Sequence, residues 1–136
     1  MPSASLKTDE VIKLVDIDRR KLRYWRDLHL VEPFLESTGK GVHAEFNLEN
    51  IIHLYIIREL AESGLTTKAI QTIMNEARQH DIDTLSHSVI ITNGKDFVEV
   101  STGINFERVL AISPLFIMRV HPLKIKAIRN MEMLLS

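Results

Sequence analysis

Cysteine is absent from this chain of 136 residues, which excludes disulfide bonds and thiolate sites for metals or redox chemistry. A phosphate-binding glycine loop, a nucleophile elbow and an evident pair of catalytic carboxylates are missing too. The histidines lack metal-ligand spacing, which favours ordinary surface or core residues: His29, His43, His53, His80, His87 and His121. We therefore expect no enzyme activity, no metal and no cofactor.

The sequence also lacks a strong charge of one sign and a long apolar run. Its net charge is -1, so affinity for nucleic acid would have to come from the arrangement of charges and not from their total. We recognise neither a signal peptide nor a membrane span, which predicts a cytoplasmic protein without a membrane partner. With 45% hydrophobic residues, 136 residues suffice for one domain and a small appendage.

The most informative segment is a short basic helix. Asp18 is a good N-cap residue, so the helix should begin at Arg19. At about 100° per residue, Leu22, Trp25 and Leu28 share one apolar stripe. The remaining positions carry the side chains suited to contact phosphate or bases: Arg19, Arg20, Lys21, Arg23, Tyr24 and Arg26. A solvated surface helix is the alternative interpretation.

The residues before this helix favour a DNA-binding role for it. Thr8 can cap a preceding short helix with an apolar stripe, and a three-residue turn over positions 15–17 leads from it to the basic helix. Two short helices joined in this way describe a helix-turn-helix, whose second helix enters the major groove of DNA with its N-terminal residues on base edges. Those residues are Arg19, Arg20 and Arg23, and the planar arginine fork can bind guanine or phosphate.

A wing and two further helices are predicted next. Residues 30–35 and 42–46 are typical of a two-stranded wing around a Gly-Lys-Gly tip, where Lys40 is well placed for a DNA phosphate. Asn47 can cap a third helix that ends at Ser63-Gly64, and Thr66 or Thr67 can start a fourth.

From about residue 6 to about residue 77, the chain resembles the winged helix-turn-helix DNA-binding domain of the MerR family of bacterial transcription regulators. The matching segments follow one another in order: Leu22-Arg23-Tyr24-Trp25, Leu28-His29-Leu30-Val31-Glu32-Pro33, Phe46-Asn47-Leu48-Glu49-Asn50-Ile51, Arg58-Glu59-Leu60 and Ser63-Gly64-Leu65-Thr66-Thr67-Lys68-Ala69-Ile70. The resemblance implies a homodimer that binds a palindromic promoter element in double-stranded DNA and distorts it so that RNA polymerase can engage.

Three departures from the family pattern stand out. Asp16 and His29 occupy positions where glycine is common, so both turns must tolerate a side chain. Ala44 replaces the usual wing arginine, and Lys40 or His43 can substitute for its phosphate contact in part. The long coiled-coil dimerisation helix of the family is missing, because no heptad pattern is sustained after the fourth helix.

The C-terminal part of the chain has a different character. β-prone runs at 88–92 and 97–100 flank Asn93-Gly94, which predicts a hairpin whose two turn residues have positive φ. Residues 104–111 favour one or two helical turns, 115–120 favour a strand, and Pro122 opens a final helix. The predicted fold class is therefore α+β, with a mainly helical winged helix-turn-helix domain over 1–78 and a small β-rich module with a C-terminal helix over 79–136.

This module is the candidate dimerisation or partner-binding surface, since it is apolar and small for an independent monomer. The residues expected to form the dimer interface are Leu115, Ile117, Ile125, Ile128, Met131 and Leu135. A tail packed on its own winged helix is the alternative. For function, we expect a sequence-specific transcriptional regulator in the nucleoid. The alternatives are an architectural, excisionase-like or chromosome-anchoring DNA protein, and an interaction adaptor that binds DNA weakly.

Overall fold

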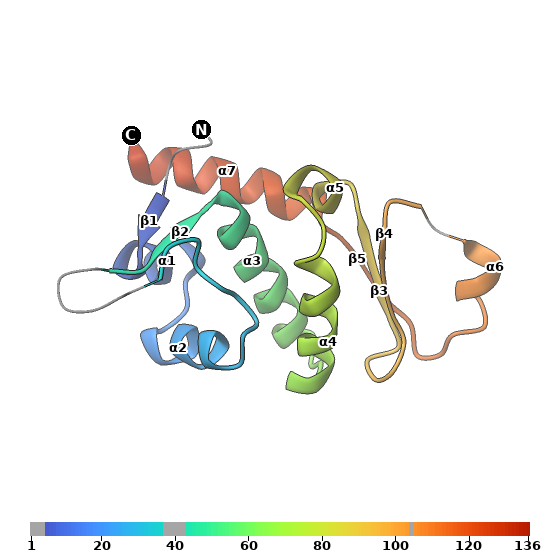
Figure 1. The fold of residues 1–136 in the computed structure, drawn as a ribbon. Coiled ribbons are helices and arrows are strands. Elements are labelled where there is room, and N and C mark those ends of the chain that lie inside the picture. Colours follow the sequence, from blue (N-terminus) through green and yellow to red (C-terminus); the bar gives the residue numbers. More distant parts are fainter. Residues whose placement is uncertain (1–4, 37–42, 104) are drawn as a thin grey trace.

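The fold is α+β, as predicted, with a helical N-terminal part followed by a strand-rich part and a final helix (Figure 1). The structure is a computed structural model that describes residues 5–36, 43–103 and 105–136. The N-terminal elements are β1 (Ser5–Lys7), α1 (Thr8–Val15), α2 (Arg19–Asp27), β2 (Glu45–Asn47), α3 (Leu48–Glu62) and α4 (Thr67–Ala77). The C-terminal elements are α5 (Ile82–Ser86), β3 (Val89–Thr92), β4 (Val98–Ser101), α6 (Phe106–Val109), β5 (Phe116–Arg119) and α7 (His121–Leu135).

The helix-turn-helix begins with one corrected cap and continues with one confirmed cap. Thr8 is the first residue of α1 and not its cap, and the Glu10 carboxylate accepts a hydrogen bond from the Lys7 backbone N–H at 2.9 Å. Asp18 caps α2 as predicted, because its Oδ1 accepts a hydrogen bond from the Lys21 N–H at 2.6 Å. The start of the basic helix is therefore fixed by a local contact.

Both turns predicted to tolerate a side chain in place of glycine do so. Asp16 has φ 61° and His29 has φ 58°, which is the left-handed region that glycine adopts most easily. Arg58 of α3 holds the first turn, because its guanidinium donates to the Val15 carbonyl and lies 3.9 Å from the Asp16 carboxylate. The turn between α1 and α2 is thus anchored to the longest helix of the N-terminal part.

The wing base differs from the predicted two-stranded hairpin. β1 pairs antiparallel with β2, a pairing that the sequence analysis did not anticipate. Of the predicted strand 30–35, only Leu35 forms a bridge, to Glu45. Pro33 has no N–H to donate, and the Phe34 N–H is used by the Asn50 side chain, so this segment cannot continue the ladder. The predicted tip around Lys40 lies outside the described residues.

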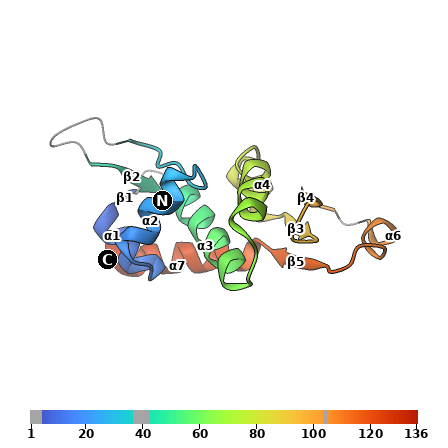
Figure 2. The ribbon, with the colours of Figure 1, turned by 90° about the horizontal axis from the view of Figure 1, so that it is seen from below.

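The final helix packs on the N-terminal part. α7 runs across α3 and the end of α1 (Figures 1 and 2), and Asn130 of α7 donates a hydrogen bond to the Tyr55 hydroxyl of α3 at 2.9 Å. Met131 is fully buried in the hydrophobic cluster that includes α3, so its prediction as a dimer contact is wrong. The division of the chain at residues 78 and 79 stays a prediction, and one apolar cluster extends over both sides of it.

The C-terminal sheet contains the predicted hairpin with a longer loop. Strands β3 and β4 pair antiparallel, and the sheet order is β4-β3-β5. The loop runs over residues 93–97, where the Asn93 N–H donates to the Phe97 carbonyl, and Gly94 has φ 81°. Asn93 is not in the positive-φ region, so the predicted two-residue turn is wrong in that detail. α5 was not predicted, and α6 lies within the expected helical segment.

Candidate DNA interface

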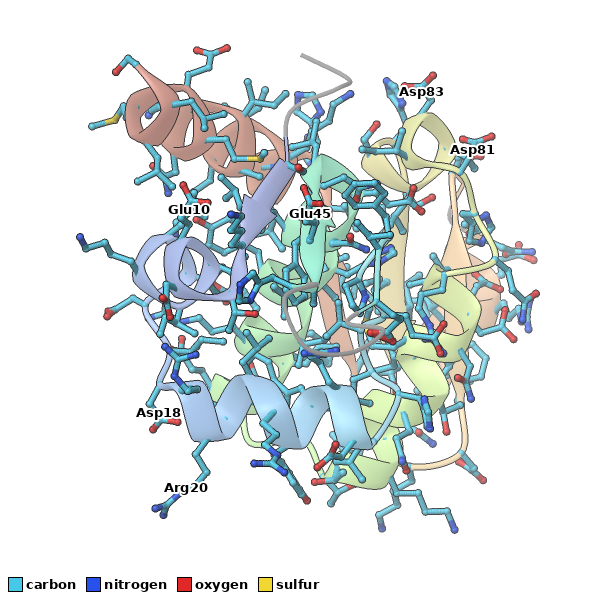
Figure 3. All side chains as sticks on the ribbon, turned by 60° about the vertical axis from the view of Figure 1, so that its left-hand side comes forward. Glu10, Asp18, Arg20, Glu45, Asp81 and Asp83 are labelled. Carbon is cyan, nitrogen blue, oxygen red and sulfur yellow. The ribbon has the colours of Figure 1, made fainter. Side chains whose placement is uncertain are left out.

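Helix α2 forms a ridge with one buried and one exposed side. Leu22 and Trp25 are buried in the core with 1% and 5% of their surface exposed, as the apolar stripe predicted. The opposite side carries basic residues, and Arg20 extends from the helix into solvent (Figure 3). Because its inner stripe is fixed in the core, the helix presents its outer residues in a defined orientation.

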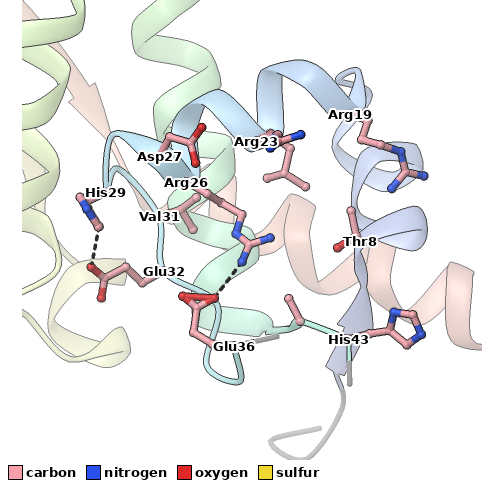
Figure 4. Close-up of a pocket in the computed structure, with 12 residues that line it drawn as sticks. Thr8, Arg19, Arg23, Arg26, Asp27, His29, Val31, Glu32, Glu36 and His43 are labelled. Carbon is pink, nitrogen blue, oxygen red and sulfur yellow. Dashed lines mark hydrogen bonds and ion pairs between the residues drawn. The ribbon is translucent and has the colours of Figure 1, made fainter. Parts of the chain in front are cut away.

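On one side of the ridge, a hollow separates α2 from the base of the wing (Figure 4). Arg19, Arg23 and Arg26 line it from α2, and His43 lines it from the opposite wall. Carboxylates line the same hollow, namely Asp27, Glu32 and Glu36. The surface here has mixed charge. Its affinity for an anion therefore depends on which arginines lack a carboxylate partner and not on how many arginines there are.

Two of the predicted DNA-binding arginines have acidic partners within the chain. Arg26 donates to the Glu36 carboxylate at 2.8 Å, and its guanidinium lies 5.8 Å from the centre of the Phe46 ring. Arg19 forms an ion pair with Asp9 of α1. Arg26 is also partly buried, whereas Arg19 is mostly exposed. The pairing assigns Arg26 to holding the loop after α2 against the wing base.

The other basic residues of α2 are free of such partners. Among the described residues, Arg20, Lys21 and Arg23 have no carboxylate within ion-pair distance, and all three are exposed. Tyr24 is 52% exposed on the same outer face, so its ring is accessible beside these cations. The structure therefore brings three unpaired cations and one aromatic ring together on the outer surface of one helix.

A second hollow lies on the other side of the ridge. Arg20, Lys21 and Tyr24 line it from α2, and Leu65 and Thr67 line it from the turn between α3 and α4. Thr67 opens α4, whose first N–H groups provide an anion-binding end, and the Thr66 cap was the signal in the sequence. Sequence reasoning did not assign Thr67 to this surface, because only the fold places Thr67 next to α2.

A network of buried polar groups supports the loop after α2. The Asn50 side-chain oxygen accepts hydrogen bonds from the Asn47 and Phe34 N–H groups, each at 3.0 Å, and its amide donates to the Glu32 carbonyl at 2.8 Å. Asn47 caps α3 in return, as predicted, by accepting from the Asn50 N–H. One buried side chain thus ties α3 to both the wing base and the loop, a role that the sequence analysis did not assign to it.

A buried histidine of α3, His53, and the partly buried Arg78 at the end of α4 lie close together. His53 is 3% exposed, and burial lowers its pKa from 6.5 to about 4, with the charge of Arg78 acting in the same direction. The Arg78 guanidinium lies 3.4 Å from the Glu32 carboxylate. Buried His53 Nε2 and Arg78 Nε have no hydrogen-bond partner among the described groups. These residues belong to the framework and not to the exposed surface.

The remaining predicted residues occupy varied environments. His43 is exposed at the wing base, and Ala44 is buried with 4% of its surface exposed. The predicted phosphate contact of Lys40 stays a prediction. In the part of the chain that the structure describes, no group of three or more acidic or histidine side chains could hold a metal ion. Within the same residues, no helix combines the length and apolar character needed to cross a membrane.

Comparison with known proteins agrees with this geometry. Uncharacterized HTH-type transcriptional regulators of Mycobacterium bovis and Mycobacterium tuberculosis are each 24% identical to the chain over 92 residues. The match covers 67% of this chain and 41% of each relative, so the chain spans about two fifths of the length of these curated relatives. The model of the MerR HTH family regulatory proteins matches residues 6–77, more than half of the chain. The chain therefore belongs to the MerR family of helix-turn-helix regulatory proteins.

Proposed function

We propose that this protein is a sequence-specific transcriptional regulator that binds a palindromic promoter element as a homodimer and distorts it. The observation that carries the proposal is the outer surface of α2, where Arg20, Lys21 and Arg23 are exposed and have no acidic partner among the described residues. An α-helix fits the major groove of B-DNA, and arginine forks can bind guanine edges or phosphates there. The family is one of regulatory proteins, and the relatives are described as transcriptional regulators. Both descriptions support a non-enzymatic role in the nucleoid.

The hollows on either side of α2 suit the two phosphate backbones that border a major groove. Arg19 and His43 lie by the hollow toward the wing, and Thr67 lies by the hollow toward α4. Contacts to phosphate position a protein on DNA, while contacts to base edges confer specificity. We therefore assign base contacts to Arg20 and Arg23, and backbone contacts to the flanking residues.

Binding to a palindrome requires two recognition helices held about 34 Å apart, or at a multiple of that distance. Strand β5 lies at an edge of its sheet and offers a means of pairing. The Val120 N–H donates to the Ser88 carbonyl, and hydrogen-bonded pairs alternate along an antiparallel ladder. Ile117 and Arg119 therefore direct their backbone groups away from β3, toward the free edge.

A second copy can pair with this edge about a two-fold axis at Ile117. Ile117 would then lie beside its own copy, and Leu115 would lie opposite Arg119 of the second copy, so no like charges would face each other. Ile117 is 47% exposed and Leu115 is 39% exposed. On α7, Ile125 and Leu135 are exposed and Ile128 is partly buried, which provides an alternative dimer surface.

Fluorescence anisotropy with an operator found by genome-wide mapping tests the DNA contacts. Arg20→Ala or Arg23→Ala should each cost about 1–3 kcal/mol of binding free energy and relax specificity at one base pair. Arg129→Ala, an exposed arginine of α7, is the matched control and should have no such effect. Unchanged affinity and salt dependence in both α2 variants would contradict the proposal. Footprints clustered over many sites would favour the architectural alternative, and the absence of any footprint would favour the adaptor.

Light scattering tests the dimer and its surface. The full chain should be a dimer, and Ile117→Lys should convert it to a monomer because two lysines would meet at the two-fold axis. Ile125→Lys places the same charge on the exposed face of α7. Loss of the dimer only in the Ile125 variant would move the interface to α7, and a monomeric full chain would reject both surfaces.

A further inference from the structure

A second group of basic side chains lies at one end of the C-terminal sheet. In the antiparallel register, Val89 of β3 pairs with Arg119 of β5. The same register sets His87, two residues before Val89, opposite His121, two residues after Arg119. His87 lies just before β3 and His121 is the first residue of α7, so both flank the Val89–Arg119 pair at this end of the sheet. Their geometry agrees, because the His87 and His121 ring centres are 6.2 Å apart.

This group borders a hollow that the proposed DNA interface does not use. His87, Val89, Arg119 and His121 line it together with two serines, Ser86 and Ser88. Its volume is about 340 Å³, enough for a group larger than a single ion. Of the described residues that line it, none is acidic. Its lining is therefore basic, unlike the mixed lining of the hollow beside α2.

Hydrogen bonds within the chain leave specific donors for a ligand. The Ser86 and Ser88 hydroxyls donate to the backbone carbonyls of Asp83 and Thr84. His87 Nδ1 lies 2.8 Å from the Asp83 carbonyl and is therefore the protonated nitrogen that donates to it. Arg119 has no carboxylate partner among the described residues. The groups left to bind a ligand are the Arg119 guanidinium and the two imidazoles.

We propose that this hollow binds the phosphate group of a small phosphorylated molecule. A guanidinium binds two phosphate oxygens at once, and an imidazole supplies a donor, or a donor and a charge when it is protonated. Phosphate has enough oxygens and charge to engage Arg119, His87 and His121 together, whereas a carboxylate has only two oxygens. Helix α7 begins at His121, so its positive end adds to the attraction for an anion.

The DNA backbone offers the same chemical group and is the competing source. The position of the hollow favours a small molecule, because α5 and the start of α7 lie on the other side of α3 from α2 (Figure 1). A straight duplex seated on α2 would run along the opposite side of the molecule. The site is therefore separate from the surface that binds DNA in the proposed function and does not depend on that proposal.

Titration of the full chain with methyl phosphate, at ionic strength held constant with chloride, tests the site by NMR. The ring C–H signals of His87 and His121 should shift in a saturable way, while those of the partly exposed His80, which neither proposed site uses, should not. Arg119→Gln should weaken binding by about tenfold or more, since it removes the charged fork. Arg129→Gln, at an exposed position on α7, is the matched control and should bind as the unchanged chain does. Because Arg119 is exposed, its replacement should preserve the fold, which circular dichroism can verify.

Three results would overturn the proposal. The first is the absence of saturable shifts, and the second is an equal response to acetate at the same concentration. The third is displacement of methyl phosphate by duplex DNA together with weaker DNA binding by Arg119→Gln, which would assign the hollow to the DNA backbone. Retained DNA affinity in Arg119→Gln, with loss of methyl phosphate binding, is the result expected for a small-molecule site.

Discussion

The outer surface of α2 and the junction where the loop after α2 meets α3 and the end of α4 use the same kinds of polar residue in opposite ways. On α2, Arg20 and Arg23 are exposed and have no acidic partner in the described part of the chain, so their charges are available to a ligand. At the junction, Asn50 satisfies three backbone groups and Arg78 pairs with Glu32. Polar groups bonded within the chain hold the framework, and polar groups left free mark the surfaces that bind.

This comparison predicts that variants at the two regions affect different properties. Replacement of a free cation on α2 should change DNA affinity and leave the free energy of unfolding within about 0.5 kcal/mol, as for most surface substitutions. Replacement of a bonded residue at the junction should mainly change stability.

His53 should make the fold sensitive to acid. Its pKa is about 4 in the folded chain and 6.5 when unperturbed, so the unfolded chain binds a proton between these values and the folded chain does not. The free energy of unfolding should therefore fall as pH decreases from 6.5 to about 4, by about 3 kcal/mol in total from this residue. Above pH 6.5, His53 is neutral in both the folded and the unfolded chain, so none of this free energy of unfolding is lost. Urea unfolding at a series of pH values measures it.

His53→Leu should remove most of that loss, and His43→Gln, at an exposed position, should retain it. The comparison between variants is necessary because another group acts in the opposite direction. Burial raises the pKa of Glu49, with Asp81 contributing, so protonation of Glu49 in acid favours the folded chain. Equal pH dependence in His53→Leu and the unchanged chain would show that His53 does not titrate as its burial requires.

Asn50→Ala should lower the free energy of unfolding by about 1–3 kcal/mol, because it leaves buried partners without their hydrogen bonds. The affected groups are the Phe34 and Asn47 N–H donors and the Glu32 carbonyl. Asn50→Asp keeps the acceptor but buries a carboxylate whose second oxygen faces the Glu32 carbonyl, so it should destabilise at least as much in a thermal unfolding experiment. An unchanged free energy of unfolding in Asn50→Ala would indicate that water replaces the side chain and that the loop does not depend on Asn50.

Local signals explain why so much of the N-terminal part could be predicted. The caps Asp18 and Asn47 act within four residues. The turns at Asp16 and His29 were recognised from the family pattern, in which glycine is common at both positions, and both residues have positive φ. The family resemblance identified the arrangement that joins them. Of the candidate site, the exposed face of α2 followed from helical periodicity alone, since Leu22 and Trp25 define the buried side.

The parts that sequence reasoning missed depend on contacts between distant residues. β1 pairs with β2 across 40 residues, as in the Ser5 hydroxyl that donates to Glu45, and no local pattern encodes that register. Asn130 reaches Tyr55 across 75 residues, which buries Met131 within its own chain. An apolar stripe on a helix predicts burial but not the partner, and the dimer prediction for Met131 was wrong for that reason.

The smallest effect is expected at His29, which lies in a strained turn. Its replacement should raise the free energy of unfolding, whereas replacement of Asn50 should lower it. His29 has φ 58°, a conformation that costs an L-residue energy and costs glycine little. His29→Gly should therefore raise the free energy of unfolding by about 0.5–1 kcal/mol, after the greater freedom of glycine in the unfolded chain is deducted. The side chain that is lost is exposed and lies 3.5 Å from the Glu32 carboxylate, so little stabilisation is lost with it. Gln71→Gly, in the middle of α4, is the control and should destabilise by about 0.5–1 kcal/mol. Destabilisation of both variants alike in urea titrations would mean that His29 is not strained and that its side chain contributes to holding the loop after α2.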